Sequence, residues 1–311
     1  MQIPQRLHVY QDATADSTRW DGFRPRAGDI VVCTPPKCGT TWAQMLCAML
    51  VHDSPVLPRP LTQMSRWLES RRVPVEQLLA DLEAQPGPRI VKSHTPLDGL
   101  PWFEEVRYVF CGHDPRDAYL SMIDHLQNLS EAALAEIRRH GDIPDGAAMP
   151  RDPNVLFPMW ATVGRVPWMY DGGPFPSVIA FTETYWRFRR LPNLLFLHYR
   201  DLTEDLEGEF RRLAAFLGYD IDSARWPEFL QAASFAAMKE RADDVAPDAD
   251  LDTWRSNAAF FRSARIGQWR QVLTPENQAL YEEVNRQRLP PAMKAWLEGG
   301  RGAAGDPREA D

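Results

Sequence analysis

DIVVCTPPKCGTTW, residues 29–42, is the stretch that decides the fold. Four apolar, mostly β-branched residues follow Asp29, a pattern typical of a buried parallel strand. The strand ends before Pro35 and Pro36, and a helix is expected from about Thr41, because apolar residues then recur at helical spacing. A strand, a loop and a helix in this order predict one unit of an α/β fold.

The same alternation recurs along the chain. Three more apolar runs are predicted as strands, at residues 89–92, 106–111 and 193–199. Helices are expected from about residue 115 to 126 and from about 203 to 217, with Gly218 as a left-handed cap. This alternation predicts a single α/β domain with a central parallel β-sheet flanked by helices. The domain is expected to span residues 1–298, and residues 299–311, which lack an apolar anchor, to form a flexible tail.

Composition and charge narrow the class of protein. Of the 311 residues, 44% are hydrophobic, and 43 acids against 35 bases give a net charge of −8. Such an acidic chain is not expected to bind nucleic acid, and no apolar run is long enough for a transmembrane segment. The first twenty residues lack the apolar region of a signal peptide, which predicts a cytoplasmic location. The four cysteines lack the spacing of a metal site, so no metal is expected.

Residues 34–42 are the candidate anion site. Backbone N–H groups at the start of a helix have no partner within the helix and attract phosphate. Lys37 adds a positive charge, and Thr40 and Thr41 add hydroxyl donors. The lysine precedes Gly39, whereas the lysine of a Walker A loop follows its glycine, which disfavours an ATPase-type loop.

Four strings, in the right order, resemble the cytosolic-type sulfotransferase family. They are PPKCGTTW at 35–42, RIVKSHTP at 89–96, HDPRDAYLS at 113–121 and FRSARIGQWR at 261–270. The family's PKSGTTW loop grips the 5′-phosphosulfate of the donor PAPS, and its KTHLP segment carries the catalytic histidine. Its RNPKDVAVS and RKGxxGDWK segments hold the 3′-phosphate. The resemblance spans about residues 28 to 275, and it is closest to mycobacterial glycolipid-type sulfotransferases.

The resemblance implies the sulfotransferase fold, with a P-loop-like phosphosulfate-binding loop, and a metal-independent reaction. The sulfuryl group of PAPS would pass to a hydroxyl or an amine, leaving PAP. His94 would be the general base, because an attacking hydroxyl must lose its proton. Lys37 would stabilise the leaving oxygen. Lys92 lies two residues before His94 on an extended strand, so both side chains would point to one side, with Lys92 at the sulfuryl group.

The resemblance also assigns the donor-binding residues. The loop would bind through Lys37, Cys38, Gly39, Thr40, Thr41 and Trp42. The 3′-phosphate would be held by His113, Ser121 and Arg262 and by the backbone of Ser263 and Ala264, next to Phe261. Tyr199 would contact the adenine, and Trp42 and Phe235 would stack on it.

Several positions depart from the family pattern. Cys38 replaces a serine, His113 an arginine and Ala264 a glycine. Because histidine is only partly charged near neutrality, donor affinity is expected to weaken from about pH 6 to 7.5 as His113 loses its proton. The dimer-contact pattern of vertebrate relatives is not intact here, so the oligomeric state stays open. The aligned positions are Arg270, Thr274, Pro275 and Ala279.

Other functions and several acceptors stay open. The departures fit a non-catalytic module that binds PAP or PAPS, and a nucleotide kinase is a weaker alternative. The acceptor would be a small molecule or a glycolipid, since an aromatic wall suits a phenol, a steroid or a lipid-linked sugar. Candidate wall residues are Trp67, Trp102, Phe103, Trp160, Trp168 and Tyr170, and residues 127–176 are a candidate lid.

Overall fold

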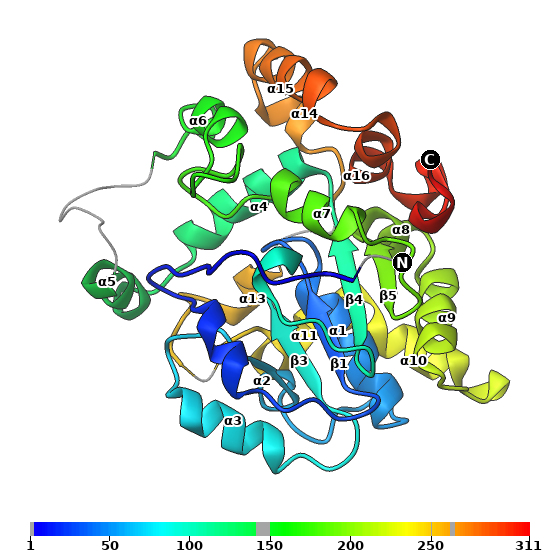
Figure 1. Ribbon diagram of the computed structural model, residues 1–311. Coiled ribbons are helices and arrows are strands. Elements are labelled where there is room, and N and C mark those ends of the chain that lie inside the picture. Colours follow the sequence, from blue (N-terminus) through cyan, green and yellow to red (C-terminus); the bar gives the residue numbers. More distant parts are fainter. Residues whose placement is uncertain (1–2, 141–149, 250, 262–264) are drawn as a thin grey trace.

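A five-stranded parallel sheet forms the centre of the protein (Figure 1). The computed structural model describes residues 3–140, 150–249, 251–261 and 265–311. The strands are β1 (Ile30–Cys33), β2 (Ser65–Trp67), β3 (Ile90–Ser93), β4 (Arg107–Gly112) and β5 (Leu194–His198). Their order is β2-β3-β1-β4-β5, and every neighbouring pair is parallel. The predicted fold class is confirmed.

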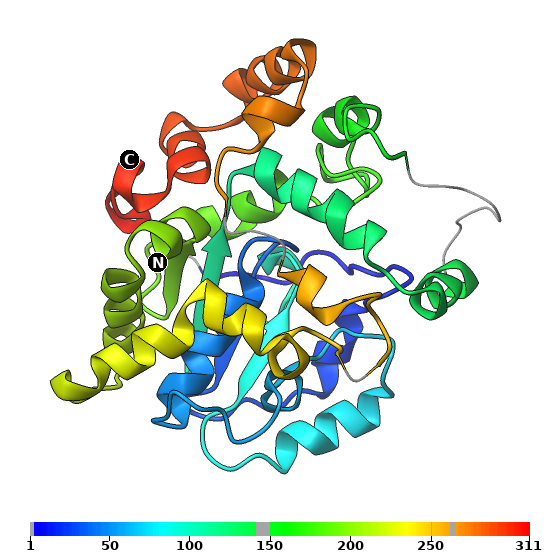
Figure 2. The same ribbon diagram turned by 180° about the vertical axis from the view of Figure 1, so that it is seen from behind.

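Helices cover both faces of this sheet, as the front and back views show (Figures 1 and 2). The α-helices are α1 (Thr40–Val51), α2 (Leu61–Met64), α3 (Val75–Glu83), α4 (Pro115–Gln127), α5 (Glu131–His140), α6 (Phe157–Thr162), α7 (Ile179–Trp186), α8 (Tyr199–Glu204), α9 (Leu206–Leu217), α10 (Trp226–Ala233), α11 (Phe235–Glu240), α12 (Ala242–Val245), α13 (Asn257–Phe260), α14 (Trp269–Val272), α15 (Pro275–Arg288) and α16 (Pro291–Ala304). Short 3₁₀ helices are η1 (Ser17–Gly22), η2 (Leu97–Gly99), η3 (Ser223–Arg225) and η4 (Pro307–Glu309).

The core consists of two layers separated by the sheet. Residues along β1 alternate between them, because successive strand side chains point to opposite faces. Val31 packs with side chains of α3, α4, α7 and α16, whereas Ile30 and Val32 pack with those of α1, α9 and α10. Both faces of the strand are buried, which explains why its sequence is continuously apolar rather than alternating.

The four predicted strands are all present, and β2 was missed. β2 has only three residues, and Arg66 lies in its middle, so it gives no apolar run to detect. The helix expected from 203 to 217 is two helices. Asp205 ends α8, and its carboxylate accepts a hydrogen bond from the N–H of Gly208 and so begins α9. Gly218, with a φ of 80°, caps α9 as predicted.

Residues 299–311 differ from the flexible tail that was expected. They complete α16 and form η4, and Pro307 is buried. The N–H of Arg301 donates to the carboxylate of Asp201 over 2.7 Å, and Arg308 donates to the carbonyl of Leu194 over 2.8 Å. Polar contacts therefore anchor this segment, which is why a search for apolar anchors did not find them.

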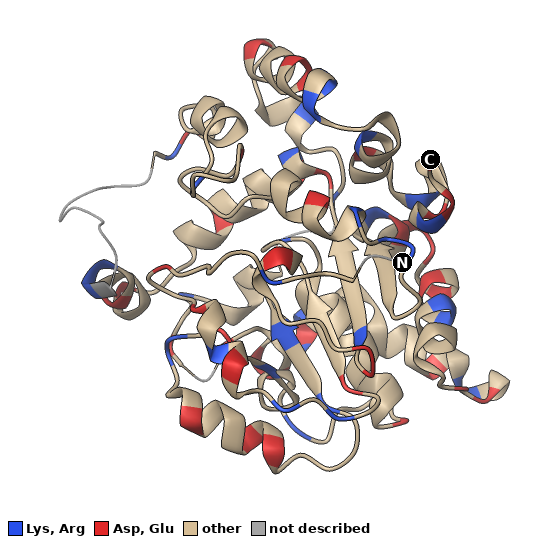
Figure 3. Cartoon of the chain, viewed as in Figure 1, with Lys and Arg blue, Asp and Glu red and all other residues tan. Residues whose placement is uncertain are grey.

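Charged residues of both signs are spread along the described parts of the chain (Figure 3). Acidic segments are prominent on α3, and blue and red segments lie together on α9 and α15. Within the described residues, no helix is long and apolar enough to cross a membrane.

Candidate functional site

A cavity lies where β1, β3 and β4 end, and it contains most of the predicted site residues. Predicted residues that line it are Lys37, Gly39, Thr40, Thr41, Trp42, Lys92, His94, His113, Ser121, Tyr199, Phe235 and Phe261. The carboxyl ends of parallel strands meet at one edge of a sheet, and this edge is the usual ligand site of open α/β folds. The topology thus brings together residues that are far apart in the sequence.

The loop between β1 and α1 presents its backbone to this cavity. Gly39, with a φ of 84°, precedes α1, and no side chain caps the helix. A Cβ at Gly39 would lie 3.1 Å from both Cys111 Sγ and the ring of Tyr199, so glycine fits here. The hydroxyls of Thr34 and Thr40 lie 2.5 Å apart and tie the strand to the helix. The first N–H groups of α1 therefore stay available to an anion.

Cys38 was predicted to bind the donor, but its side chain does not line the cavity. It is fully buried, its Sγ lies 3.8 Å from the carbonyl of Pro36, and burial raises the pKa of the thiol. Cys38 can therefore serve a ligand through its backbone alone. All four cysteines are free and buried, as predicted.

His94 has the geometry of a base. Its Nδ1 lies 2.8 Å from the carbonyl oxygen of Thr34. That oxygen can only accept, so Nδ1 carries the proton and Nε2 keeps a free lone pair. Burial and the nearby cations Lys92 and Lys37 hold the pKa of His94 well below its usual value. The imidazole is therefore neutral at physiological pH and able to accept a proton.

Two lysines supply positive charge beside His94. The ammonium of Lys92 lies 4.7 Å from the ring centroid of Trp67, and burial lowers its pKa. Lys37, with a φ of 69°, adopts the left-handed region that disfavours residues other than glycine. Burial and the charge of Lys92 lower the pKa of Lys37 to about 7.

His113 closes the other side of the cavity, next to β5. Its ring stacks on Tyr199, with centroids 4.5 Å apart, and Tyr199 contacts Trp42 edge to face. Burial, His198 and Arg200 hold the pKa of His113 well below its usual value. In the free protein His113 is therefore already neutral between pH 6 and 7.5, which differs from the loss of a proton expected in that range. Its buried Nδ1 has no hydrogen-bond partner within the described residues.

Ser121 lies on α4 and shares its cavity-facing side with residues that sequence reasoning missed. Asp117, Asp124 and His125 also line the cavity. They lie three or four positions from Ser121, and such residues share one face of a helix. These residues could have been found from the sequence, by listing the residues three and four positions before and after Ser121 on the predicted helix. Predicted Arg262, Ser263 and Ala264 lie outside the described residues, but Arg265 and Gln268, just after them, line the cavity.

Comparison with known proteins agrees with this geometry. Residues 27–295 match the family described as sulfotransferase domain. This chain belongs to the sulfotransferase family. It is 36% identical over 316 residues to a glycolipid sulfotransferase of Mycobacterium bovis, with 94% of each chain covered. It is 25% identical to human sulfotransferase 1C2, with 90% of each chain covered. The prediction of a PAPS-dependent sulfotransferase from the sequence is confirmed by this membership.

Solved structures share the fold of this sulfotransferase. Retinol dehydratase in a complex with retinol and PAP matches with a TM-score of 0.67 and 19% identity, over 89% of this chain and 87% of that one. Mouse sulfotransferase SULT7A1 complexed with PAP matches with a TM-score of 0.63 and 18% identity, over 87% and 88%. The predicted sulfotransferase fold is therefore confirmed.

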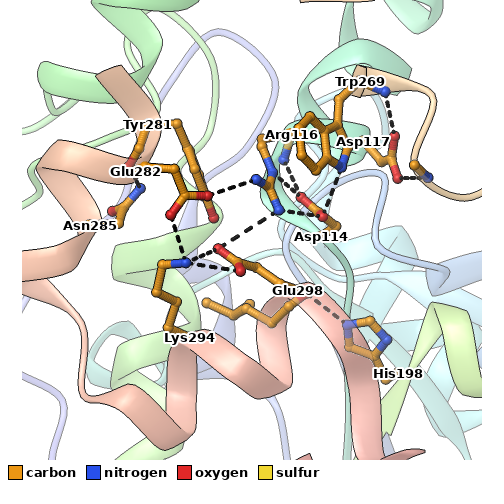
Figure 4. A network of polar contacts seen from close by, with 12 residues as sticks. Asp114, Arg116, Asp117, His198, Trp269, Tyr281, Glu282, Asn285, Lys294 and Glu298 are labelled. Carbon is orange, nitrogen blue, oxygen red and sulfur yellow. Dashed lines mark hydrogen bonds and ion pairs between the residues drawn. The ribbon is translucent and has the colours of Figure 1, made fainter. Parts of the chain in front are cut away.

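A network of charges around the buried pair of Arg116 and Asp114 lies beside the cavity of the sulfotransferase, at the start of α4 (Figure 4). The guanidinium of Arg116 binds both carboxylate oxygens of Asp114 over 2.9 Å and Glu282 on α15 over 3.1 Å. It also lies 3.6 Å from the ring centroid of Trp269. We call this the α4 network. Its members are Asp114, Arg116, Asp117, Trp269, Tyr281, Glu282, Lys294 and Glu298.

The α4 network also holds the loop that follows the undescribed residues 262–264. The carboxylate of Asp117 accepts the N–H of Gly267 over 2.5 Å and that of Trp269 over 3.2 Å. The indole N–H of Trp269 donates to Asp114 over 3.0 Å. The loop that brings Arg265 and Gln268 to the cavity is thus fixed to α4.

The candidate acceptor wall is only partly assembled. Trp67 contacts His94 edge to face, with ring centroids 5.4 Å apart, and so lies beside the base. Trp102 instead stacks on Tyr108 near the beginning of β4, and Trp160 is buried in the core. Trp168 is exposed and stacks on His8. Phe103 and Tyr170 also pack against the core away from the cavity. Of the six proposed wall residues, Trp67 alone touches the site within the described residues.

Proposed function

We propose that this protein transfers the sulfuryl group of PAPS to a hydroxyl of a glycolipid or an apolar small molecule, with His94 as the general base. The observation that carries the proposal is the bond between Nδ1 of His94 and the carbonyl of Thr34, which leaves Nε2 free. The acceptor oxygen forms a bond to sulfur, and its proton passes to Nε2. An amine acceptor would follow the same course.

The residues of the cavity fit such a donor. The N–H groups that begin α1 suit the 5′-phosphosulfate, and the unpartnered Nδ1 of His113 suits a phosphate oxygen. Tyr199, Trp42 and Phe235 offer ring faces for the adenine. PAPS supplies the activated sulfuryl group and leaves as PAP. The ammonium of Lys37 would stabilise the charge that develops on the departing oxygen.

The nature of the acceptor rests on the relatives. The mycobacterial proteins at 35 to 36% identity are named glycolipid sulfotransferases, which favours a glycolipid. The cytoplasmic location, the metal independence and the oligomeric state stay predictions. A non-catalytic PAP-binding module on the same fold is the alternative, and His113 and Cys38, which replace an arginine and a serine of the family pattern, favour it.

Calorimetric titration separates these functions. PAP should bind with micromolar affinity, much more tightly than ADP and without magnesium. Transfer of label from PAPS to a panel of phenols, sterols and glycolipids then separates the enzyme from the binding module. If PAP does not bind, the donor assignment is wrong; if it binds but no panel member is sulfated, the module is favoured.

A further inference from the structure

The side chain of Lys37 does not extend freely into the cavity. Its Nζ lies 3.5 Å from Nδ1 of His125, in the last turn of α4, and 4.1 Å from the ring centroid of Phe260. Within the described parts of the chain, no ion pair joins this ammonium to a carboxylate. The ammonium therefore rests between an imidazole nitrogen and an aromatic face, both of which attract a cation.

The imidazole of His125 is the acceptor in this contact. An ammonium can only donate, so Nδ1 carries the lone pair and the proton of the neutral ring is on Nε2. Burial and the cations Lys37 and Lys92 keep the pKa of His125 well below its usual value, so the ring stays neutral beside the ammonium form of Lys37, which predominates below pH 7. The separation of 3.5 Å exceeds that of an ordinary hydrogen bond, so the contact is weak enough to be exchanged for an anion.

The position of His125 is fixed by an aromatic cluster. Its ring contacts Trp254 at 4.7 Å and Phe260 at 6.2 Å between centroids, and these two rings lie 5.2 Å apart. A backbone bridge between Leu129 and Trp254 joins the end of α4 to this segment. The imidazole at the end of α4 is thus held by two rings of one distant segment, residues 254–260, and it contacts the ammonium of Lys37 in turn.

We propose that His125 is a positioning residue for Lys37. Its Nδ1 accepts a hydrogen bond from the ammonium and keeps that group at the edge of the donor site until the phosphosulfate replaces it. This inference rests on the proposed function. A carboxylate in this place would pair with Lys37 strongly and compete with the donor, whereas a neutral imidazole orients the ammonium without neutralising it.

Other charged groups share the cavity with this pair and are present in every variant. Lys92 lies on β3, and His94 follows it in the next loop. Asp117 and Asp124 lie on α4, and Arg265 lies in the loop that begins directly after the undescribed residues 262–264. Tyr199 and His113 line the far wall. The experiment therefore compares two substitutions at one position, which leave this surrounding charge unchanged.

The test uses His125→Phe and His125→Gln in the full chain. Phenylalanine keeps the ring in the aromatic cluster and removes the acceptor, whereas glutamine keeps an acceptor oxygen. We expect His125→Phe to lower kcat about tenfold, because Lys37 loses its orientation. In His125→Phe, the affinity for PAP should begin to fall at a pH about 0.5 unit lower than in the unmodified protein. The reason is that the hydrogen bond from Lys37 to His125, which favours the charged ammonium, is lost in this variant. His125→Gln should recover most of both quantities.

A readout without turnover keeps this test apart from that of the proposed function. The ¹⁵N shifts of labelled histidine, with the His125 signal assigned from His125→Gln, report the tautomer in the free protein. A neutral ring protonated on Nε2 at pH 7 supports the inference. A ring protonated on Nδ1, or an imidazolium, overturns it whether or not PAPS is a donor. Equal kcat values and equal pH profiles for His125→Phe and the unmodified protein would also overturn the inference.

Discussion

In the described parts of the chain, buried cations are paired with carboxylates at the beginning of α4 but not at its end. At its beginning, the α4 network pairs Arg116 with Asp114, Glu282 and Glu298. At its end, His125 faces Lys37, and within the described residues no carboxylate forms an ion pair with Lys37 or Lys92. We call Lys37, Lys92, His94 and His125 the basic cluster.

The difference separates structure from function on one helix. A buried ion pair is costly to break, because removing one partner leaves the other without compensation. Buried cations without an ion-pair partner are unfavourable for the free protein and become more favourable when an anion binds. Asp248 and Glu69 offset only part of the effect of burial on the pKa of Lys92, which stays lowered. The α4 network therefore fixes the shape of the site, and the basic cluster keeps its charge for a ligand.

The largest effect is expected for His94→Ala. Loss of a general base costs about 10²- to 10⁴-fold in rate. Turnover with labelled PAPS and a sulfated panel acceptor should fall by this factor, while calorimetry should find PAP affinity within about twofold of the unmodified protein. Near-normal turnover in this variant would show that the proton goes elsewhere.

The next effect belongs to the α4 network. Arg116→Met leaves Asp114 buried without its partner, and such a change costs about 3–5 kcal/mol of unfolding free energy. Denaturant unfolding measures it. The matched control is Arg255→Met, because Arg255 and its partner Glu131 are both more than half exposed, at 57% and 79%. The control should cost under about 1 kcal/mol, and equal losses would remove the contrast between paired burial and surface pairing.

The sequence predicted four of the five strands and the loop after β1, but not the contacts that join distant elements. β1 and, from Tyr108 on, β4 are continuous runs of buried residues because both of their faces are covered, and this pattern is visible locally. The pairing of Lys37 with His125 links residues 88 positions apart, and that of Asp201 with Arg301 links residues 100 apart. Neither pair lies within one element, so no spacing rule detects them.

The charge state of the site was also beyond the sequence. His113 was expected to titrate near neutrality because that is the ordinary behaviour of histidine. Its burial against Tyr199 and beside Arg200 moves its pKa down, and burial moves that of Lys37 to about 7. Both shifts depend on neighbours that the fold supplies. The group expected to titrate with donor binding is therefore Lys37 rather than His113.

The third prediction concerns the link between the α4 network and the cavity. Asp117→Ala removes the acceptor for the N–H groups of Gly267 and Trp269. The loop that carries Arg265 should then lose its fixed position, and PAP affinity should fall about tenfold, equivalent to about 1.4 kcal/mol. Calorimetry with AMP, which has no 3′-phosphate, is the control. A similar loss for AMP would mean that Asp117 acts on the whole cavity rather than on this loop.

The smallest effect is a pH dependence of donor binding. Below pH 7 Lys37 is already charged, whereas above pH 7 an anion must bind together with a proton. Affinity for PAP should therefore fall as pH rises from 7.5 to 8.5, by at most about tenfold per unit for one proton. Titration in this range avoids the phosphate groups, which are fully ionised above about pH 7.

Two variants locate the proton that this titration detects. Lys37→Met should bind PAP more weakly at pH 7 and show a flat profile, because the group that takes up the proton is gone. His113→Asn should keep the slope of the unmodified protein, because a neutral His113 has no proton to exchange in this range. A slope that persists in Lys37→Met would assign the proton to Lys92, whose pKa is also lowered by burial. If the pH dependence of PAP affinity disappeared in His113→Asn, His113 rather than Lys37 would be the group that takes up the proton. The charge that binds the donor would then lie at the end of β4.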